Sequence, residues 1–444
     1  GERQQGVIVA RTPAQPGTSA KRGSKTTSNA PVDAVPQPRA AEGPSRAAQE
    51  TPAHEAAAPS RWKQFRNRIN SVAGRPGASY YWIIGTTVAL TSIGLMTVLS
   101  ASAAESISEG VDPYSLFIKE STFAAVGLVL MMALSFVRPA GLKKLAWPAL
   151  GLSGLLLMLV VFTPLGVNVG GNTNWINFGG GIQFQPSEAA KLALAVWMGM
   201  ILARKGDLVK QWRHAFVPVV PVGVVMVGLI LGGHDLGTAV IVMGVVGAGL
   251  FFGGASLKIL VPAVLGGLGA AVILAAISGN RTSRLSGWMG NCSADTGLCD
   301  QAQNGLYALA SGRWFGVGLG QSRQKWSWIP EAHNDFIFAI LGEELGLLGT
   351  LVIICLYGVM AFAIFRVIMK RNDTFARVVC GAILTWIIGQ AFVNIAMVTG
   401  LLPVIGVPLP LISYGGSALV VVLAAIGVVL SFAREEPESA LIQK

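Results

Sequence analysis

Residues 336–368 read FIFAILGEELGLLGTLVIICLYGVMAFAIFRVI, and this apolar run decides the class of the protein. A helix of about 20 apolar residues crosses a bilayer, so the run predicts a membrane span that tilts or protrudes. It contains two adjacent glutamates, Glu343 and Glu344, whose side chains point about 100° apart on a helix. Because carboxylates are costly in lipid, we expect at least one to meet a partner or a watery cavity; a structural pair and a functional site both fit.

The composition of the whole chain agrees with a membrane protein. Of its 444 residues, 52% are hydrophobic and 12% are charged, and the mean hydropathy is +0.58. Soluble globular proteins carry about 25% charged residues. An ordinary soluble domain and a fully disordered chain are therefore excluded, and four cysteines are too few for a disulfide scaffold. The predicted class is an all-α polytopic membrane protein.

Nine further apolar runs bring the prediction to ten transmembrane helices. The expected spans are residues 82–101, 116–137, 144–163, 188–203, 215–231, 236–253, 258–278, 336–368, 376–401 and 411–433. Loops rich in Lys and Arg are expected in the cytoplasm, whereas loops 164–187, 232–235 and 402–410 carry none. Ten spans with both termini in the cytoplasm satisfy this alternation. The long loop 279–335 then lies outside despite its basic residues, which points to an anionic ligand.

The chain begins with a basic segment. Residues 1–78 hold 12 Lys/Arg and 5 Asp/Glu, so they carry +7 of the formal net charge of +11. This segment is rich in small and polar residues and is predicted to be a disordered cytoplasmic tail that binds anionic lipid or a cytosolic partner. No motif supports binding to nucleic acid. The membrane domain is expected at residues 79–433, and a second short cytoplasmic tail at 434–444.

Polar residues also cluster where three of the spans begin. Glu188 and Lys191 follow Pro186 at the start of the fourth span, and they fit either a helix cap with a local ion pair or a substrate site. Before the eighth span, Asn334 or Asp335 can cap the helix. The last span opens with Pro408-Leu409-Pro410-Leu411-Ile412-Ser413-Tyr414-Gly415-Gly416-Ser417, which predicts a broken helix entry; a plain turn is the alternative.

Four motifs occur together and in order along the chain. They are Gln185-Pro186-Ser187-Glu188, His234-Asp235-Leu236-Gly237-Thr238-Ala239, Pro330-Glu331-Ala332-His333-Asn334-Asp335-Phe336-Ile337-Phe338 with Gly342-Glu343-Glu344-Leu345-Gly346, and the proline-glycine motif of the last span. Over about residues 80–433 the chain resembles the SEDS family, named for shape, elongation, division and sporulation. It is more similar to the division member than to the elongation member.

The resemblance implies a peptidoglycan glycosyltransferase with ten spans. Such a protein polymerises lipid II outside the bacterial cytoplasmic membrane and releases undecaprenyl diphosphate. The resemblance also implies partners, namely a class B penicillin-binding protein transpeptidase and other divisome membrane proteins. The implied location is the division septum.

The family has an essential Asp in the outer loop after the seventh span. The corresponding stretch is Ala294-Asp295-Thr296-Gly297-Leu298-Cys299-Asp300-Gln301. Counting back from Gln301 without a gap puts that Asp on Ala294, and a shift of one residue puts it on Asp295. The resemblance thus points to Asp295 as the base that takes the proton of the acceptor hydroxyl, with Asp300 as the alternative. A solvated turn is the plain interpretation of both.

The leaving diphosphate requires positive charge. Where the family often has Arg-Trp-Ile, this chain has Asn174-Trp175-Ile176, so phosphate contacts are expected elsewhere. A divalent cation, Mg²⁺ or Mn²⁺, is a further candidate, with its ligands left open. The expected substrate-binding residues are Glu188, Lys191, Arg281, Arg284, Arg313, Lys325, His333, Asp335, Ser413, Gly415 and Gly416.

Two cysteines bracket the expected base. Cys292 and Cys299 are predicted to lie outside, where disulfides persist, and to form a bridge; two free thiols are the alternative. Cys355 and Cys380 fall in apolar spans and are expected to be buried.

Other functions also fit a polytopic protein with intramembrane carboxylates. A flippase for lipid-linked precursor, an elongation polymerase of the same family, and a scaffold that recruits a synthase are the alternatives. The ionisable and aromatic residues of the 279–335 loop favour the enzyme, because a flippase needs charges along a path through the membrane.

Overall fold

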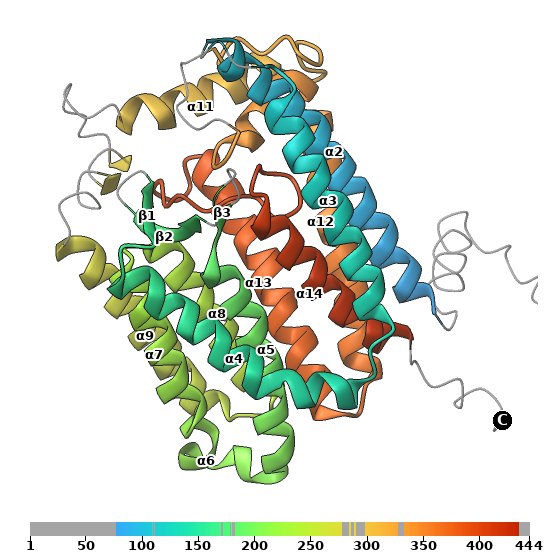
Figure 1. Cartoon of the computed structure of the whole chain (residues 1–444), viewed down its shortest axis with the longest axis vertical. Helices are drawn as coiled ribbons and strands as arrows, with labels where there is room; N and C mark the ends of the chain where they lie inside the picture. Colours follow the sequence, from blue (N-terminus) through green and yellow to red (C-terminus); the bar gives the residue numbers. More distant parts are fainter. Residues whose placement is uncertain are drawn as a thin grey trace, which may run out of the picture. The chain divides into compact units, whose positions relative to one another are not determined.

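The computed structural model describes residues 77–108, 110, 112–169, 172–177, 179, 183–277, 284–285, 288–289, 298–326 and 333–434. Nearly all of both predicted tails lies outside these residues, so the tails stay predictions. The described helices are α2 (Ala78–Ser108), α3 (Ser115–Ser135), α4 (Pro139–Phe162), α5 (Pro186–Lys205), η1 (Gly206–Lys210), α6 (Trp212–Phe216), α7 (Val219–Gly232), α8 (Leu236–Phe252), α9 (Leu257–Ile277), α11 (Leu298–Gly312), α12 (Ile337–Lys370), α13 (Thr374–Val398) and α14 (Ser417–Arg434) (Figure 1).

The membrane character of the sequence is confirmed. Within the described residues, seven helices are long and apolar enough to cross a membrane: α2, α3, α4, the stretch Trp212–Gly232, α12, α13 and α14. Leu236–Phe252 and Leu257–Gly267 are shorter apolar helices. Each of the ten predicted spans overlaps at least one described helix, and the span 215–231 overlaps both α6 and α7.

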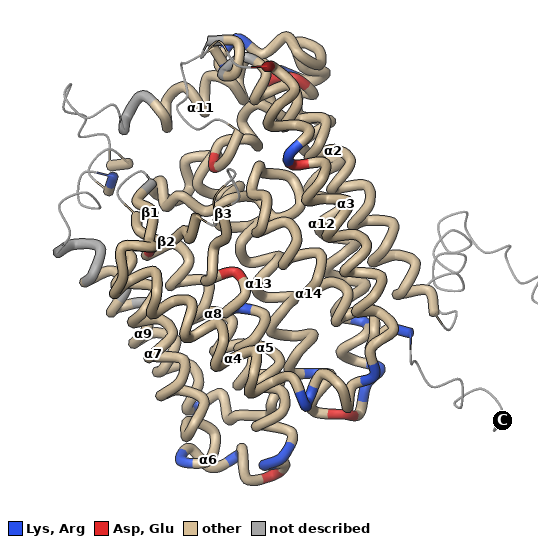
Figure 2. The backbone as a smooth tube through the Cα atoms, viewed as in Figure 1, with Lys and Arg blue, Asp and Glu red and all other residues tan. Residues whose placement is uncertain are grey.

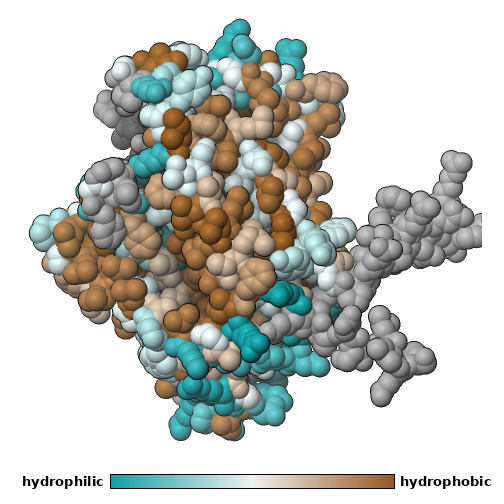
Figure 3. Space-filling model, turned by 45° about the vertical axis from the view of Figure 1, so that its right-hand side comes forward, coloured by the Kyte–Doolittle hydropathy of each residue, from teal (hydrophilic) through white to brown (hydrophobic). Residues whose placement is uncertain are grey.

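Charge and hydropathy divide the bundle into zones. Acidic and basic residues gather at its two ends, with few between them (Figure 2). Apolar side chains dominate the surface between the ends, as Figure 3 shows for one face. An apolar zone between two polar ends is the surface that a bilayer-embedded helix bundle requires.

The helices pack closely around an apolar core. α3 lies against α14, α2 against α12, and α13 against both α5 and α8. At the α3–α14 contact, a Cβ on Gly427 would lie 2.5 Å from the Met131 carbonyl oxygen. The absence of a side chain therefore lets the two backbones approach, as small residues do in membrane bundles.

Three features depart from the sequence expectation. The chain is not purely helical, because β1 (Gly166–Val169), β2 (Asn172–Asn177) and β3 (Gln183–Phe184) form an antiparallel sheet in the order β1-β2-β3. Ile176 is paired with Gly166 on one side and Phe184 on the other. The α12 helix is interrupted at Gly346, whose φ of 69° is not helical. The last helix starts at Ser417 rather than 411, because Leu411 and Gly416 have positive φ angles.

Candidate active site

A buried ion pair lies in the first turns of α5. The Lys191 ammonium donates to Glu188 Oε1 at 2.7 Å and to Gln390 Oε1 of α13 at 2.9 Å. The same ammonium lies over the Trp386 ring, 4.8 Å from its centroid. Both charged side chains are at most 2% exposed, so the charges compensate each other out of water. The local pair expected from the sequence is confirmed, whereas the expected cap is not, since Gln185 caps α5 without a side-chain hydrogen bond.

Two amides of α13 hold the segment that leads to the last helix. Gln390 Nε2 donates to the Pro408 carbonyl at 3.0 Å. Asn394 Nδ2 donates to the carbonyls of Val407, at 2.7 Å, and Asp335, at 2.8 Å. Asn394 thereby joins the entry of α12 to the segment before α14. Backbone carbonyls that a continuous helix would satisfy are satisfied here by side chains.

The proline-glycine motif folds as an ordered turn rather than as helix. Ser413 Oγ accepts from Leu409 N at 2.8 Å, and Tyr414 N donates to the His333 carbonyl at 3.1 Å. The His333 and Tyr414 rings meet edge to face, with centroids 5.4 Å apart. The motif predicted a broken entry, and the structure confirms it.

A carboxylate from α3 reaches the same turn. Glu120 Oε2 accepts from Gly416 N at 2.9 Å, and Glu120 is 1% exposed. Ser417 Oγ accepts from Gln185 N at 3.2 Å. The first turn of α5, the glycine pair and α3 therefore meet at one place.

Arg284 and Asp335 converge on the neighbouring part of this segment. A Cβ on Gly406 would lie 3.3 Å from Asp335 Oδ2 and 3.6 Å from Arg284 Nη1. The glycine, with a φ of 75°, leaves room for both side chains. A cation and a carboxylate thus lie beside the segment that Asn394 anchors.

The small sheet docks on the turn between α7 and α8. Asp235 caps α8 by accepting from Thr238 N at 2.9 Å. Asn174 Nδ2 donates to the other oxygen of Asp235 at 2.9 Å. Where relatives of the family are expected to carry a cation, Asn174 is therefore an amide donor to a helix-capping carboxylate.

Glu343 and Glu344 organise the loop that follows α11. Ser322 Oγ and Arg323 N donate to the Glu343 carboxylate, the second at 3.1 Å. Glu344 Oε1 accepts from Ser100 Oγ of α2 at 2.6 Å and lies 3.4 Å from Lys325 Nζ. Both glutamates are 2% exposed. The expectation that at least one has a partner is confirmed for both.

The structure brings many of the predicted substrate-binding residues together. Around the segment 403–417 lie Glu188, Lys191, Arg284, His333, Asp335, Ser413, Gly415 and Gly416. Lys325 lies instead in the Glu344 cluster, where its ammonium also donates to the Gly320 carbonyl at 2.8 Å. Arg313 is exposed beyond α11, and its carbonyl accepts from Leu347 N at 2.9 Å. The substrate roles of these residues stay predictions.

Several predictions fall on residues outside the described ranges. These are the catalytic role of Asp295, the binding role of Arg281 and the Cys292–Cys299 bridge, of which Cys292 lies outside the described ranges. Asp300, the alternative base, lies in the first turn of α11 rather than in a turn.

Two minor expectations are wrong. Phe336, not Asn334 or Asp335, stands at the N-cap of α12, without a side-chain hydrogen bond. Cys380 is buried as expected, but Cys355 is exposed, because it lies on an outward-facing side of α12.

Sequence reasoning missed three residues of this site, Glu120, Gln390 and Asn394. Each is a polar residue within an apolar span, which was the available signal. None belongs to a motif, so neither their partners nor their importance was visible without the tertiary contacts.

An apolar groove opens beside the site. It has a volume of about 860 Å³ and is lined by α7, α8 and α9, with Phe216 of α6 and Thr385 of α13. Leu236 and Ala239, at the start of α8, belong to its lining. The groove therefore reaches the N-terminal end of α8, which Asp235 caps, and extends along this helix to Phe252.

Metal ligation has no support within the described residues. There, no three His, Cys, Asp or Glu side chains gather closely enough to hold a metal ion. A divalent cation stays a prediction, and no step proposed below depends on one.

Comparison with known proteins places this geometry among relatives. A family model described as "Cell cycle protein", for FtsW, RodA and SpoVE, matches residues 81–438. A Mycobacterium tuberculosis protein named "Probable peptidoglycan glycosyltransferase FtsW" is 36% identical over 430 residues, which cover 95% of this chain and 78% of that protein. "Stage V sporulation protein E" of Bacillus subtilis is 34% identical over 348 residues, covering 78% of this chain and 95% of that protein.

Solved structures also match. The crystal structure of the Thermus thermophilus rod shape determining protein RodA has a TM-score of 0.60 at 26% identity, covering 80% of this chain and 96% of that chain. A chain from a structure titled "Structural coordination of polymerization and crosslinking by a peptidoglycan synthase complex" has a TM-score of 0.64 at 27% identity, covering 81% and 98%.

Proposed function

Because the chain belongs to the FtsW, RodA and SpoVE family, we propose that it is a peptidoglycan glycosyltransferase that polymerises lipid II during septal cell-wall synthesis. The observation that carries this proposal is the identity of 36%, over 95% of the chain, to relatives named peptidoglycan glycosyltransferase. The polar residues around the segment 403–417 support it, because they converge from α5, α13 and the segment before α12 at one place.

The reaction needs a base and a stabilised leaving group. A base takes the proton of the acceptor hydroxyl as its oxygen bonds to the donor sugar carbon, and the bond from that carbon to undecaprenyl diphosphate breaks. We assign the base to Asp295, with Asp300 as the alternative. Arg284 and Arg281 are the proposed cations for the diphosphate, and Arg284 lies beside Gly406 in the described structure.

The groove along α7, α8 and α9 suits the lipid part of the substrate. Its lining is almost wholly apolar, and its volume of about 860 Å³ admits a long hydrocarbon chain. We propose that a polyprenyl chain lies in it, with the diphosphate directed toward the 403–417 segment. Burial of the chain contributes about 25 cal/mol per Å² of apolar surface.

The proposed topology has ten crossings with both termini in the cytoplasm. The loops carrying Lys and Arg then face the cytoplasm, and the segment 403–417 faces outside, where lipid II is used. Maleimide labelling of single cysteines at Lys144 and Gly179 in intact cells tests this: only the second should react with an impermeant reagent.

We further propose a class B penicillin-binding protein as partner and the septal cytoplasmic membrane as location.

A lipid II flippase is the alternative function. The buried Glu188–Lys191 pair is the observation that favours it, because ionisable groups at membrane depth often line transport paths. The pair is, however, bonded to Gln390 and packed on Trp386, which fits a fixed structural role.

Glycan synthesis by the purified protein tests the proposal. The full chain is combined with its class B penicillin-binding protein, lipid II and Mg²⁺ or Mn²⁺, and glycan length is read on a gel. We expect long chains from the wild type and a loss of at least about 100-fold in Asp295→Asn. Asp112→Asn, which removes a carboxylate between α2 and α3, is the control and should retain activity.

The outcomes separate the alternatives. Loss in Asp300→Asn with activity retained in Asp295→Asn would move the base to Asp300. If an intact wild-type complex makes no glycan but the protein transfers lipid II across vesicle membranes, the function is that of a flippase and not of a polymerase.

A further inference from the structure

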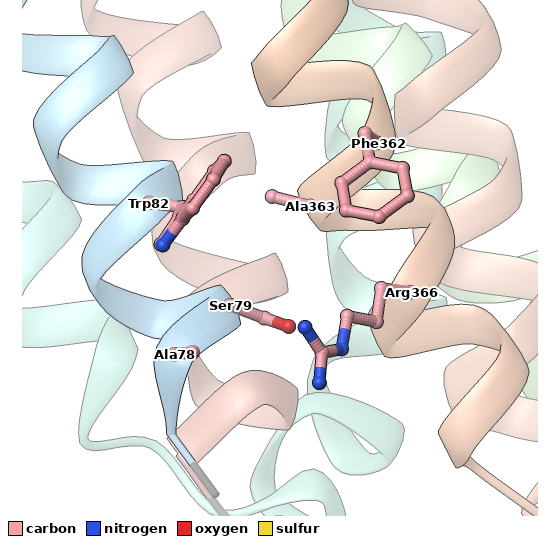
Figure 4. Close-up of a pocket in the computed structure, with 6 residues that line it drawn as sticks. All are labelled: Ala78, Ser79, Trp82, Phe362, Ala363 and Arg366. Atoms are coloured by element: carbon pink, nitrogen blue, oxygen red, sulfur yellow. The ribbon is translucent and has the colours of Figure 1, made fainter. Parts of the chain in front are cut away.

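A small recess lies between the start of α2 and the late part of α12, away from the 403–417 segment. It is lined by Ala78, Ser79, Trp82, Phe362, Ala363 and Arg366 (Figure 4). Arg371, five residues further along, donates to the Phe432 carbonyl near the end of α14. The recess therefore opens at the end of the bundle where α12 and α14 finish.

An unpartnered hydroxyl marks the recess as a binding site. Ser79 is 2% exposed, and its Oγ has no hydrogen-bond partner within the described residues. Figure 4 shows this hydroxyl pointing toward the Arg366 guanidinium. A buried hydroxyl without a partner is destabilising, so a bound acceptor would restore the lost hydrogen bond.

Arg366 adds a positive charge that the described residues do not neutralise. It is partly buried, and within that part of the chain it makes no hydrogen bond or ion pair. No carboxylate lines the recess. The first turn of α2 also presents N–H groups without intrahelical partners, which favour an anion. The Ser79 hydroxyl, the Arg366 guanidinium and the N-terminus of α2 thus all favour a negatively charged hydrogen-bond acceptor.

The size and surroundings define the ligand further. The recess has a volume of about 10 Å³, which is room for about one oxygen atom. Apart from Ser79 and Arg366 its lining is apolar, with the aromatic rings of Trp82 and Phe362 on the two helices, and Phe362 is 55% exposed. A ligand that inserts one anionic oxygen and covers apolar rim residues is an amphiphile.

We propose that this recess binds the phosphate of an anionic phospholipid, with Ser79 and Arg366 as its ligands. One phosphate oxygen enters between the two side chains, and the acyl chains lie along the aromatic side chains of Trp82 and Phe362. The site is distinct from the glycosyltransferase site, and it stands whether or not that function is correct.

Lipid retention by the full-length protein tests the proposal. Protein in detergent is titrated with phosphatidylglycerol, and bound lipid is counted by native mass spectrometry. Phosphatidylcholine tests the need for net negative charge, and inorganic phosphate tests the need for acyl chains. We expect phosphatidylglycerol to bind to the wild type. Arg366→Gln should weaken this binding about tenfold, and Ser79→Ala should weaken it about threefold.

The variants distinguish a site from a structural role. Lys144→Gln removes an exposed charge at the same end of the bundle and should leave lipid binding unchanged. If the recess holds only water, Ser79→Ala will bind phosphatidylglycerol like the wild type, and the proposal fails. Equal loss in all three variants would mean general surface charge and would also overturn it. If inorganic phosphate binds saturably and Arg366→Gln weakens its binding equally, the ligand is free phosphate and the lipid proposal fails.

Discussion

At the residue scale, the described charges buried within the bundle are engaged by specific partners. Lys191 bonds to Glu188 and Gln390, and Glu343 and Glu344 accept from the loop 322–325. The two glutamates therefore hold the loop 322–325 against the interrupted helix α12. The cost of burying a carboxylate is offset only while its partners remain.

Lys325→Met should lower the free energy of unfolding by about 3 kcal/mol, because Glu344 would keep its buried charge without a cation. The side chains of Lys325 and Glu344 are 6% and 1% exposed. Denaturation in SDS micelles, followed by circular dichroism, measures the change.

Two variants control this prediction. Arg323→Met removes an exposed charge two residues away and should change stability by less than about 0.5 kcal/mol. Adding Glu344→Gln to Lys325→Met should recover most of the loss. A double variant no more stable than Lys325→Met would show that the ion pair is not the cause.

At the element scale, the break in α12 provides the attachment point for the segment that follows α11. Val317 N and Gly318 N donate to the carbonyls of Glu343 and Glu344, which a continuous helix would have used internally. Gly346 permits this with a φ of 69°, and a Cβ there would lie 2.3 Å from Gly316 N. The helix is therefore opened to dock a second segment.

Gly346→Ala should destabilise the protein by at least about 2 kcal/mol and reduce glycan synthesis, because the new Cβ collides with backbone and the φ is strained. Gly358→Ala is the matched control in the same helix, since its Cβ would meet nothing within 4 Å. That variant should be neutral or more stable by up to about 1 kcal/mol. Equal stability of both variants, measured as above, would contradict the role of the break.

At the scale of the whole molecule, the groove and the polar site are built by helices that are distant in sequence. α7, α8 and α9 line the groove, while α5, α13, the segment before α12 and the 403–417 segment supply the polar residues. Asp235 lies between them, because it caps α8 and binds Asn174 of the sheet. The apolar groove and the polar site therefore lie on either side of the start of α8.

Gly244→Leu should raise the KM for lipid II about tenfold and leave kcat nearly unchanged, because the side chain fills part of the proposed lipid groove. Gly244 lines the groove. Steady-state glycan synthesis at varied lipid II measures both constants.

Gly266→Leu is the control for the groove. It lies on α9, does not line the groove, and its Cβ would meet nothing within 4 Å. Kinetics unchanged in Gly266→Leu but altered in Gly244→Leu would support lipid binding in the groove. Unchanged KM in Gly244→Leu would place the lipid elsewhere.

The sequence by itself determined the class, the approximate position of each apolar helix and the motifs of the family. These follow from composition and local patterning, because about 20 apolar residues form a helix in lipid whatever their neighbours are. The buried pair Glu188–Lys191 was also visible, since three residues separate the partners on one helix face.

Only the tertiary structure decided which polar residues meet across the bundle. Ser100 and Glu344 are 244 positions apart, and Gly416 and Glu120 are 296 apart. Spans that are apolar all round do not reveal which face meets which neighbour. The packing of small residues and the breaks at Gly346 and Pro408–Gly416 determine which helix faces meet. The contacts of the site therefore arise from the fold and not from any one segment.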